Sequence, residues 1–141
     1  MKTPPAPART LPAIDNDNRA YWTGGEHGRL MICRCGHCGY YVHPPVPFCP
    51  QCESSDVAPE PVSGRGRIAS FTVNHKVWVP GLAAPYVLAL VALDEQEDVR
   101  LVCNITHCDP DAVRFDMPVV VWFENHEDLW VPFFRPVEQA A

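Results

Sequence analysis

Two Cys-x-x-Cys pairs constrain the fold of this chain more than any other feature of its sequence. Cys35 and Cys38 form the first pair, Cys49 and Cys52 form the second, and ten residues separate the two pairs. This spacing allows two tight turns to face each other and to present four thiolates to one ion, the tetrahedral sulfur site that Zn²⁺ favours. Four protein ligands leave no coordination position open for a substrate, so we expect the site to build structure rather than to perform chemistry.

The other cysteines favour metal binding over a disulfide framework. The chain has seven cysteines, an odd number, and Cys33, Cys103 and Cys108 lie outside the pairs. In a reducing cytosol, paired Cys-x-x-Cys motifs indicate a metal more often than a disulfide. Zinc is the predicted metal, and iron in a rubredoxin-like tetrathiolate is the rival, because ligand type alone does not separate the two. His37 and His43 are not expected to be ligands, since four thiolates already satisfy zinc.

Composition narrows the class of protein. With 141 residues, the chain has room for one domain or two small modules. It carries 17 Asp and Glu against 11 Lys and Arg, so it is poorly suited to neutralising phosphates, and sequence-independent nucleic-acid binding is disfavoured. No stretch approaches the roughly 20 apolar residues of a membrane helix, and the N-terminus lacks the apolar core of a secretory signal. We therefore expect no membrane partner and a cytoplasmic location.

The sequence before the metal motif predicts a tail and a short helical arm. Four prolines and little apolar content indicate an extended, flexible tail over the first 18 residues. Asn18 or Asp17 is a candidate cap for a short helix that Gly24 interrupts. Tyr21 and Trp22 are large apolar side chains in this otherwise polar arm. Two interpretations stay open: they pack back on the ribbon, or they insert into a partner.

The pattern changes to β-strands after Gly64. Predicted strands span residues 68–79, 86–93, 99–105, 119–123 and 129–134. The run at 86–93 is apolar throughout, as expected of a strand that is covered on both faces. Asp109 and Pro110 predict a short helical turn between the third and fourth strands, with Asp as the cap and Pro at the first helical position. Five strands with a helical insertion at this place match a Greek-key barrel of the OB type better than an SH3-like barrel.

These patterns together predict a mainly β protein in four parts. In order along the chain we expect a flexible Pro-rich tail, a helical arm, a zinc ribbon and a five-stranded OB-fold barrel, at residues 1–18, 19–29, 30–60 and 61–137. The ribbon is too short to fold by burial alone, so its stability should depend on the metal. About 75 residues also make a marginal barrel core, so we expect the ribbon to pack on the barrel and share its burial.

Short motifs spread over the chain carry a family resemblance. In order they are Tyr21-Trp22, Gly28-Arg29-Leu30, the two metal pairs, Pro44-Pro45, Ser63-Gly64-Arg65-Gly66, Ser70-Phe71-Thr72-Val73, Pro85-Tyr86, Cys108-Asp109-Pro110 and Met117-Pro118. Over about residues 20–136 the chain resembles bacterial and archaeal zinc-ribbon/OB-fold proteins, an acyl-CoA-associated family known as a domain of unknown function. One departure is Cys33, at a position where relatives usually have glutamine. Cys33 is a possible competitor for the metal, and we keep Cys35 as the expected ligand, because Cys35 belongs to a Cys-x-x-Cys pair.

The resemblance implies both a fold and a role. The implied fold is a helical arm, a rubredoxin-like zinc ribbon with Cys35, Cys38, Cys49 and Cys52 as ligands of structural zinc, and a C-terminal OB-fold barrel. Members of the family are companions of thiolase-type enzymes, and relatives in steroid-degrading bacteria join a thiolase-like aldolase or a hydratase. The implied role is a non-catalytic accessory or scaffold subunit that binds acyl-CoA and docks such an enzyme in a hetero-oligomer.

Six side chains are candidate contacts with the partner or with acyl-CoA. They are Tyr21, Trp22, Arg65, Arg67, Lys76 and Trp78. The three cationic side chains are candidates for the CoA phosphates, although surface solvation explains each of them singly. Trp78 is a candidate for binding, and packing in the core or at the rim of the barrel is its alternative.

Two other classes of function are alternatives to the accessory role. Zinc ribbons and OB barrels recur in proteins that bind single-stranded nucleic acid, but from Gly64 to Ala141 six Lys and Arg stand against eleven Asp and Glu. A stand-alone enzyme would have to use Cys103, His107 or Cys108. Adjacent residues at a strand end point in opposite directions, so His107 and Cys108 do not make a nucleophile–base pair.

Overall fold

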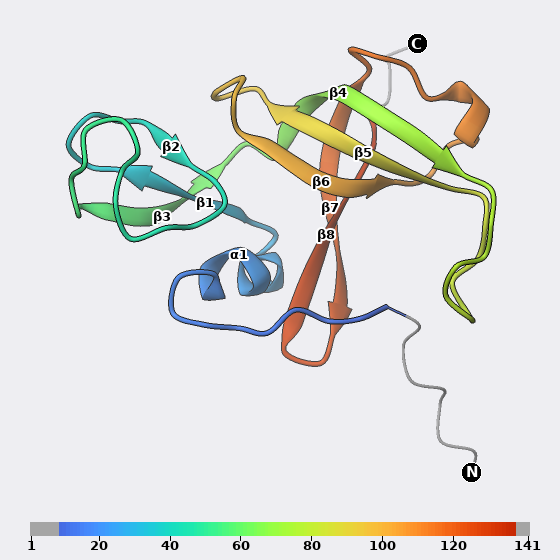
Figure 1. Cartoon of the computed structure of the whole chain (residues 1–141), viewed down its shortest axis with the longest axis horizontal. Helices are drawn as coiled ribbons and strands as arrows, with labels where there is room; N and C mark the ends of the chain where they lie inside the picture. The colour runs from blue at the N-terminus through green and yellow to red at the C-terminus, as the bar shows by residue number, and fades with distance from the viewer. Residues whose placement is uncertain (1–8, 138–141) are drawn as a thin grey trace.

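Two β-sheets lie next to each other and contain most of the chain (Figure 1). The structure is a computed structural model that describes residues 9–137, so the first eight residues of the predicted tail lie outside it. The first sheet is the ribbon, with strands in the order β2-β1-β3, and the second is a closed barrel in the order β4-β5-β6-β8-β7. The prediction of a mainly β protein with a short helix, a ribbon and a five-stranded barrel is confirmed.

The ribbon is built around β1 (Leu30–Cys35). This strand pairs antiparallel with the short β2 (Tyr41–Val42) on one side and with β3 (Val57–Val62) on the other. Leu30 and Ile32 on β1 are each 1% exposed and belong to one apolar cluster with side chains of the barrel. The ribbon and the barrel therefore share one apolar core. Either sheet alone would be too small to bury enough apolar surface for a stable fold.

Five strands form the barrel: β4 (Arg65–Asn74), β5 (Tyr86–Leu93), β6 (Arg100–Ile105), β7 (Pro118–His126) and β8 (Leu129–Pro136). Strand β4 closes the barrel by pairing with both β5 and β7, and β6 pairs in parallel with β8. The 3-10 turn η2 (Pro110–Ala112) lies between the third and fourth barrel strands, and the Asp109 side chain caps it by accepting from the Asp111 N–H. This is the OB-type barrel with the helical insertion that the sequence predicts.

Strand β5 differs from its prediction because only one of its faces is covered. Val87, Ala89, Val91 and Leu93 are buried, whereas Leu88 is 40% exposed. Successive side chains of a strand point to opposite faces, and the barrel interior takes only one set. The expectation of burial on both faces is therefore wrong, and the apolar run leaves an apolar outer face on the barrel.

Strand β4 also differs, because it ends at Asn74 and residues 75–85 form the β4–β5 loop. Val77, Trp78 and Val79 match the composition of a strand, which is why the sequence predicts one as far as residue 79. In the structure they lie in a loop that projects beyond the barrel strands (Figure 1). Composition alone does not reveal whether a partner strand is present to pair with them.

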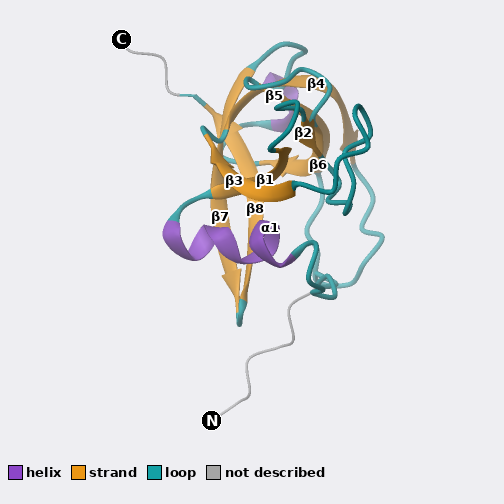
Figure 2. Cartoon of the chain, turned by 90° about the vertical axis from the view of Figure 1, so that its left-hand side faces the viewer, coloured by secondary structure: helices purple, strands orange, loops and turns teal. Residues whose placement is uncertain are grey.

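The helical arm lies against both sheets. Helix α1 (Arg19–Thr23) continues into the 3-10 helix η1 (Gly24–His27), and together they contact β1, β7 and β8 (Figure 2). A Cβ atom on Gly25 would lie 2.6 Å from atoms of Phe123 and Trp130, so only glycine allows η1 to approach the β7–β8 hairpin this closely. No helix in the described part of the chain has the length and apolar character needed to cross a membrane.

The described part of the tail also contacts the barrel. The Arg9 guanidinium lies 4.9 Å from the ring centroid of Phe133 and donates to Oδ1 of Asn104 at 3.2 Å. Asn18 occupies the cap position of α1, but its side chain accepts from the Asp15 N–H instead of capping the helix. The described part of the tail is thus attached to the barrel through the side chain of Arg9.

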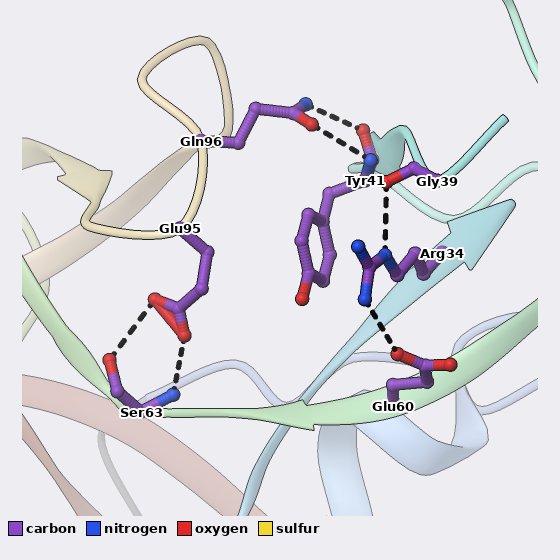
Figure 3. Close-up of polar contacts among 7 residues, drawn as sticks. All are labelled: Arg34, Gly39, Tyr41, Glu60, Ser63, Glu95 and Gln96. Atoms are coloured by element: carbon purple, nitrogen blue, oxygen red, sulfur yellow. Dashed lines mark hydrogen bonds and ion pairs between the residues drawn. The ribbon is translucent and has the colours of Figure 1, made fainter.

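The turn between β5 and β6 fastens the barrel to the ribbon (Figure 3). Gln96 accepts a hydrogen bond from the Tyr41 N–H and donates one to the Tyr41 carbonyl, each at 2.9 Å. The Glu95 carboxylate accepts from the N–H and the hydroxyl of Ser63 at 2.6 and 3.0 Å. Residues 94–98 form a polar segment of the sequence, and in the structure this segment is the junction between the two sheets.

Candidate metal centre and docking face

The four predicted ligands converge at one end of the ribbon. The Sγ atoms of Cys35, Cys38, Cys49 and Cys52 all lie within 4.8 Å of one another, with Cys35 to Cys52 at 3.6 Å and Cys38 to Cys49 at 3.5 Å. Tetrahedral zinc with Zn–S bonds of about 2.3 Å requires sulfur–sulfur separations of about 3.8 Å. The donor set therefore fits a structural tetrathiolate zinc ion. Among the residues that the structure describes, no other cluster of His, Cys, Asp or Glu offers three or more converging ligand atoms.

The two metal turns repeat one backbone pattern. The Cys35 carbonyl accepts from the Gly39 N–H at 2.9 Å, and the Cys49 carbonyl accepts from the Glu53 N–H at the same distance. The residue four positions after each first cysteine has a positive φ, +80° at Gly39 and +64° at Glu53. This repeat allows two short turns to enclose one ion. It also places a non-glycine residue, Glu53, in the left-handed region of the backbone.

Backbone N–H groups point at the first sulfur of each metal turn. The Cys38 N–H lies 3.4 Å from Cys35 Sγ, and the Gln51 N–H lies 3.4 Å from Cys49 Sγ. The hydrogen bond from Cys38 lowers the pKa of the Cys35 thiol to about 6. Burial and the neighbouring thiols raise the pKa values of Cys38 and Cys52, so of these three thiols Cys35 is the one that most readily becomes the thiolate that binds metal.

Arg34 lies beside the first metal turn and connects it to the rest of the ribbon (Figure 3). Its Nε donates to the Gly39 carbonyl at 2.9 Å, and its guanidinium lies 3.5 Å from the Glu60 carboxylate. The guanidinium also lies over the Tyr41 ring, 4.7 Å from the centroid. These contacts hold the turn against β2 and β3.

Neither histidine of the ribbon joins the donor set, as the sequence predicts. His37 is exposed in the first turn. The His43 ring packs on Tyr21 with the ring centroids 5.0 Å apart, and burial lowers the pKa of His43 to about 4. Its Nδ1 atom is buried without a hydrogen-bond partner in the described part of the chain.

The three remaining cysteines lie apart from the metal centre. Cys33 and Cys103 are 8% and 7% exposed, and burial raises the pKa of the Cys103 thiol to about 12. Burial and the charge of Asp109 raise the pKa of Cys108. Neither Cys103 nor Cys108 hydrogen-bonds to His107, whose Nδ1 instead lies 2.8 Å from the Thr106 hydroxyl.

The two aromatic residues of the arm, Tyr21 and Trp22, lie in different environments. Tyr21 is 8% exposed within the core that ribbon and barrel share, and burial raises the pKa of its hydroxyl above the usual range. Trp22 is half-buried and lines a hollow of about 360 Å³ with Pro44, Pro45 and Val102. Tyr21 therefore packs within the chain, the first of the two interpretations that the sequence leaves open, and only 8% of it is exposed for a contact with a partner or with acyl-CoA. Trp22 keeps surface that a ligand can reach.

The predicted cationic contacts do not form one site. Arg65 and Arg67 lie at the start of β4, whereas Lys76 follows its other end, on the order of 30 Å away along an extended strand. Arg67 and Arg100 flank Ala92 across three adjacent strands and line a hollow of about 250 Å³. Three carboxylate side chains line the same hollow, which makes it unfavourable for the phosphates of CoA.

The outer face of β4, β5 and β6 carries an apolar hollow of about 350 Å³. Leu88, Leu90 and Val102 line it, and Leu90 pairs directly with Val102 across β5 and β6. Leu88 and Val102 are 40% and 66% exposed. This makes the hollow a candidate interaction site. It results from the outer face of β5, which the sequence was expected to bury.

The fold and the four-thiolate site define a zinc-ribbon/OB-fold protein. Residues 22–58 match the family model of the ChsH2 rubredoxin-like zinc ribbon domain, and residues 59–124 match that of the ChsH2 C-terminal OB-fold domain. The chain belongs to this family, the DUF35 proteins, which confirms the resemblance that its motifs carry.

Three relatives indicate the range of the family. A probable enoyl-CoA hydratase alpha subunit of Thermomonospora curvata is 40% identical over 133 residues, which is 94% of this chain but 41% of that protein. A DUF35 domain-containing scaffold protein of Methanothermobacter thermautotrophicus is 35% identical over 98 residues, 68% of this chain and 72% of that protein. A chain of the solved Ltp2-ChsH2(DUF35) aldolase is 38% identical with a TM-score of 0.80, covering 89% of this chain and 98% of that one. The chain thus spans less than half of the hydratase relative.

Proposed function

We propose that this chain is a non-catalytic accessory subunit that docks an enzyme of acyl-CoA metabolism and binds acyl-CoA. The enzyme is an aldolase, hydratase or thiolase-type subunit, and its substrates are acyl-CoA thioesters of steroid or lipid metabolism. The observation that carries the proposal is the apolar outer face of the barrel, where Leu88 and Val102 are 40% and 66% exposed. Apolar surface of this extent is costly in water and is expected to be covered by a partner.

The relatives support the class of partner. One is named as the alpha subunit of an enoyl-CoA hydratase, one as a scaffold protein, and one is a chain of an aldolase complex. The words subunit and scaffold, and the joined name Ltp2-ChsH2, each describe a part of a larger assembly. The acidic composition of this chain also favours a protein partner over a nucleic acid.

The chemistry of the cysteines supports an accessory role over catalysis. The four clustered thiolates would saturate a zinc ion, so the metal would have no open position for substrate or water. The raised pKa values of Cys103 and Cys108 disfavour the thiolate that a nucleophile requires at neutral pH.

The hollow beside Trp22 is the proposed binding place for the apolar arm of acyl-CoA. It has a volume of about 360 Å³ and lies where the helical arm, the ribbon and the barrel meet. Trp22, Pro44 and Val102 supply apolar surface, and Arg100 adds one cation to its lining. Ligand pockets commonly lie at such junctions between structural units.

The test combines co-purification with titration. We expect the full chain to co-purify with an Ltp2-type aldolase subunit or a hydratase subunit of the same organism, and to bind an acyl-CoA in calorimetric titration. Trp22→Ala should weaken acyl-CoA binding about tenfold, whereas Phe48→Ala, at a residue of the ribbon that is 58% exposed, should not. Turnover of an acyl-CoA by the purified lone chain would overturn the accessory role. Absence of a complex with every aldolase, hydratase and thiolase-type subunit tested would overturn the docking role.

A further inference from the structure

The β4–β5 loop projects beyond the barrel strands (Figure 1). It carries consecutive apolar side chains that are exposed. Val77, Trp78 and Val79 are 56%, 64% and 42% exposed. Single exposed apolar side chains are ordinary on protein surfaces, but three in succession on a projecting loop, one of them tryptophan, form a patch. Tryptophan is also the residue type most enriched among side chains that dominate binding energy in protein interfaces.

Trp78 is held in place although it is exposed. Its indole Nε1 donates to Oδ1 of Asn74 at 2.8 Å, and Nδ2 of Asn74 donates to the Lys76 carbonyl at 2.7 Å. The Lys76 Nζ lies over the indole, 4.2 Å from the ring centroid. A ring that is already oriented loses little conformational entropy when a partner covers it.

The loop is continuous with the apolar outer face of the barrel. Asn74 and Thr72 on β4 pair with Tyr86 and Leu88 on β5. Side chains two positions apart on a strand share a face, so Asn74 lies on the same outer face as Leu88. The hydrogen bond to Asn74 therefore places Trp78 at the end of that face. We name this surface the Trp78 face and define it by Lys76, Trp78, Leu88, Leu90 and Val102.

The segment that carries most of the Trp78 face is cationic, although the chain is acidic. Residues 61–93 contain no Asp or Glu, and Lys76 is the cation that lies on the Trp78 face, because Arg65 and Arg67 lie at the start of β4, on the order of 30 Å away. The whole chain, by contrast, has a formal net charge of −6. The acidic side chains are concentrated in other segments, such as the turn at 94–98. A partner surface with an apolar pocket and an acidic rim would complement both the tryptophan and the charge.

We propose that the Trp78 face is the surface on which the enzyme subunit docks, with Trp78 inserted into an apolar pocket whose rim is acidic. This inference rests on the proposed function, because it assigns a binding surface to the partner of that function. A single lysine and a single indole are fewer groups than an anionic bilayer or a base-stacking groove engages. A protein pocket needs only one well-placed aromatic anchor.

The experiment measures the affinity of the full chain for an Ltp2-type aldolase subunit in three variants. Trp78→Ala should weaken binding by about 30-fold, because it removes the anchor. Lys76→Glu should weaken it about tenfold, and the affinity of the unmodified chain should fall as salt is added. Phe48→Ala is the matched control, since it removes an exposed aromatic ring of similar exposure on the ribbon, and it should leave binding within about twofold. Zinc content and thermal melting report whether each variant is folded.

The outcomes separate this inference from the proposed function. If the complex forms but Trp78→Ala binds as tightly as the unmodified chain, the assignment of the surface is wrong and the accessory function stands. If the unmodified chain forms no complex with any aldolase, hydratase or thiolase-type subunit, both fail. Hydrogen exchange gives a second measure: protection over residues 72–90 in the complex supports the inference, and protection confined to the ribbon overturns it. Binding to phosphatidylserine vesicles or oligo-dT, or self-association, that disappears in Trp78→Ala would assign the face to that occupant instead.

Discussion

The side-chain amide of Gln96 makes two hydrogen bonds with the backbone of Tyr41, a residue 55 positions earlier in the chain. Strand β2 lies at an edge of the ribbon sheet, so the amide pairs with backbone groups that a further strand would otherwise occupy. The Tyr40 hydroxyl adds a 2.6 Å hydrogen bond to the carboxylate of Asp98 in the same turn. These contacts set the orientation of the ribbon relative to the barrel.

Replacing Gln96 by alanine should loosen this junction. The Tyr41 N–H and carbonyl would lose their side-chain partner, so we expect the free energy of unfolding to fall by about 1–2 kcal/mol. We also expect faster hydrogen exchange at the Tyr41 amide. Glu97→Ala is the control, because this neighbour is exposed and lines the hollow beside Arg67 and Arg100. Unchanged protection of Tyr41 in Gln96→Ala would show that the turn does not fasten the two sheets.

Removing the metal should unfold the ribbon locally. Structural zinc contributes an apparent binding free energy of roughly 10–16 kcal/mol in small zinc-finger peptides, more than a short ribbon gains by burial. On chelation we expect residues 30–58 to lose chemical-shift dispersion. Elemental analysis should find one metal ion per chain and distinguish zinc from iron, and Cys108→Ser should not change that ratio. Dispersion retained across the ribbon after chelation would contradict the prediction.

Glu53→Gly should stabilise the second metal turn. Glu53 has a φ of +64°, a conformation that costs an L side chain roughly 1 kcal/mol and that Gly39 adopts freely in the first turn. We therefore expect the free energy of unfolding of the zinc-bound chain to rise by about 0.5–1 kcal/mol in denaturant titration. Glu53→Ala keeps a Cβ and should bring no gain. Equal effects of the two substitutions would show that the charge of Glu53, not its backbone conformation, matters.

His43 should make the fold sensitive to acid. Burial lowers its pKa from 6.5 to about 4 in the folded chain, so the folded state binds fewer protons than the unfolded state between these values. The contribution of His43 to the free energy of unfolding is therefore fully present above pH 6.5 and is lost as the pH falls towards 4. Between pH 7.5 and 5 we expect a loss of about 2 kcal/mol.

The variant His43→Phe isolates this effect. Phenylalanine keeps a ring against Tyr21 and removes the titrating group. Acid also acts on the metal thiolates, so the informative quantity is the difference between the two chains at each pH. Urea titrations that show the same acid loss in both chains would exclude His43 as its source.

Patterns that depend on local spacing predicted the structure well. The positions of the metal ligands follow from Cys-x-x-Cys spacing, because a tight turn brings its two sulfurs to one side. The alternation of Leu101, Cys103 and Ile105 with Arg100, Val102 and Asn104 indicates a strand, and β6 is that strand, with the first three side chains buried. Asp109 and Pro110 likewise predicted η2, since a cap and a fixed φ act within one turn of the chain.

Patterns that depend on distant neighbours predicted it poorly. The apolar run of β5 does not reveal which of its faces the barrel covers, and the sequence around Trp78 does not reveal that no strand pairs with it. The burial of Tyr21 depends on how the arm meets two sheets. Each of these features is decided by a surface that another segment of the chain supplies.

The amino-acid sequence by itself determined the metal ligands, the mainly β class and the order of arm, ribbon and barrel, because turns, caps and strand periodicity act over a few residues. Only the tertiary structure decided which apolar side chains stay in water and how the ribbon meets the barrel. Those outcomes depend on contacts such as Gln96 to Tyr41 that join residues far apart in the chain. Where every residue of a strand is apolar, as in β5, the local pattern does not specify the buried face, and the assembled barrel decides it.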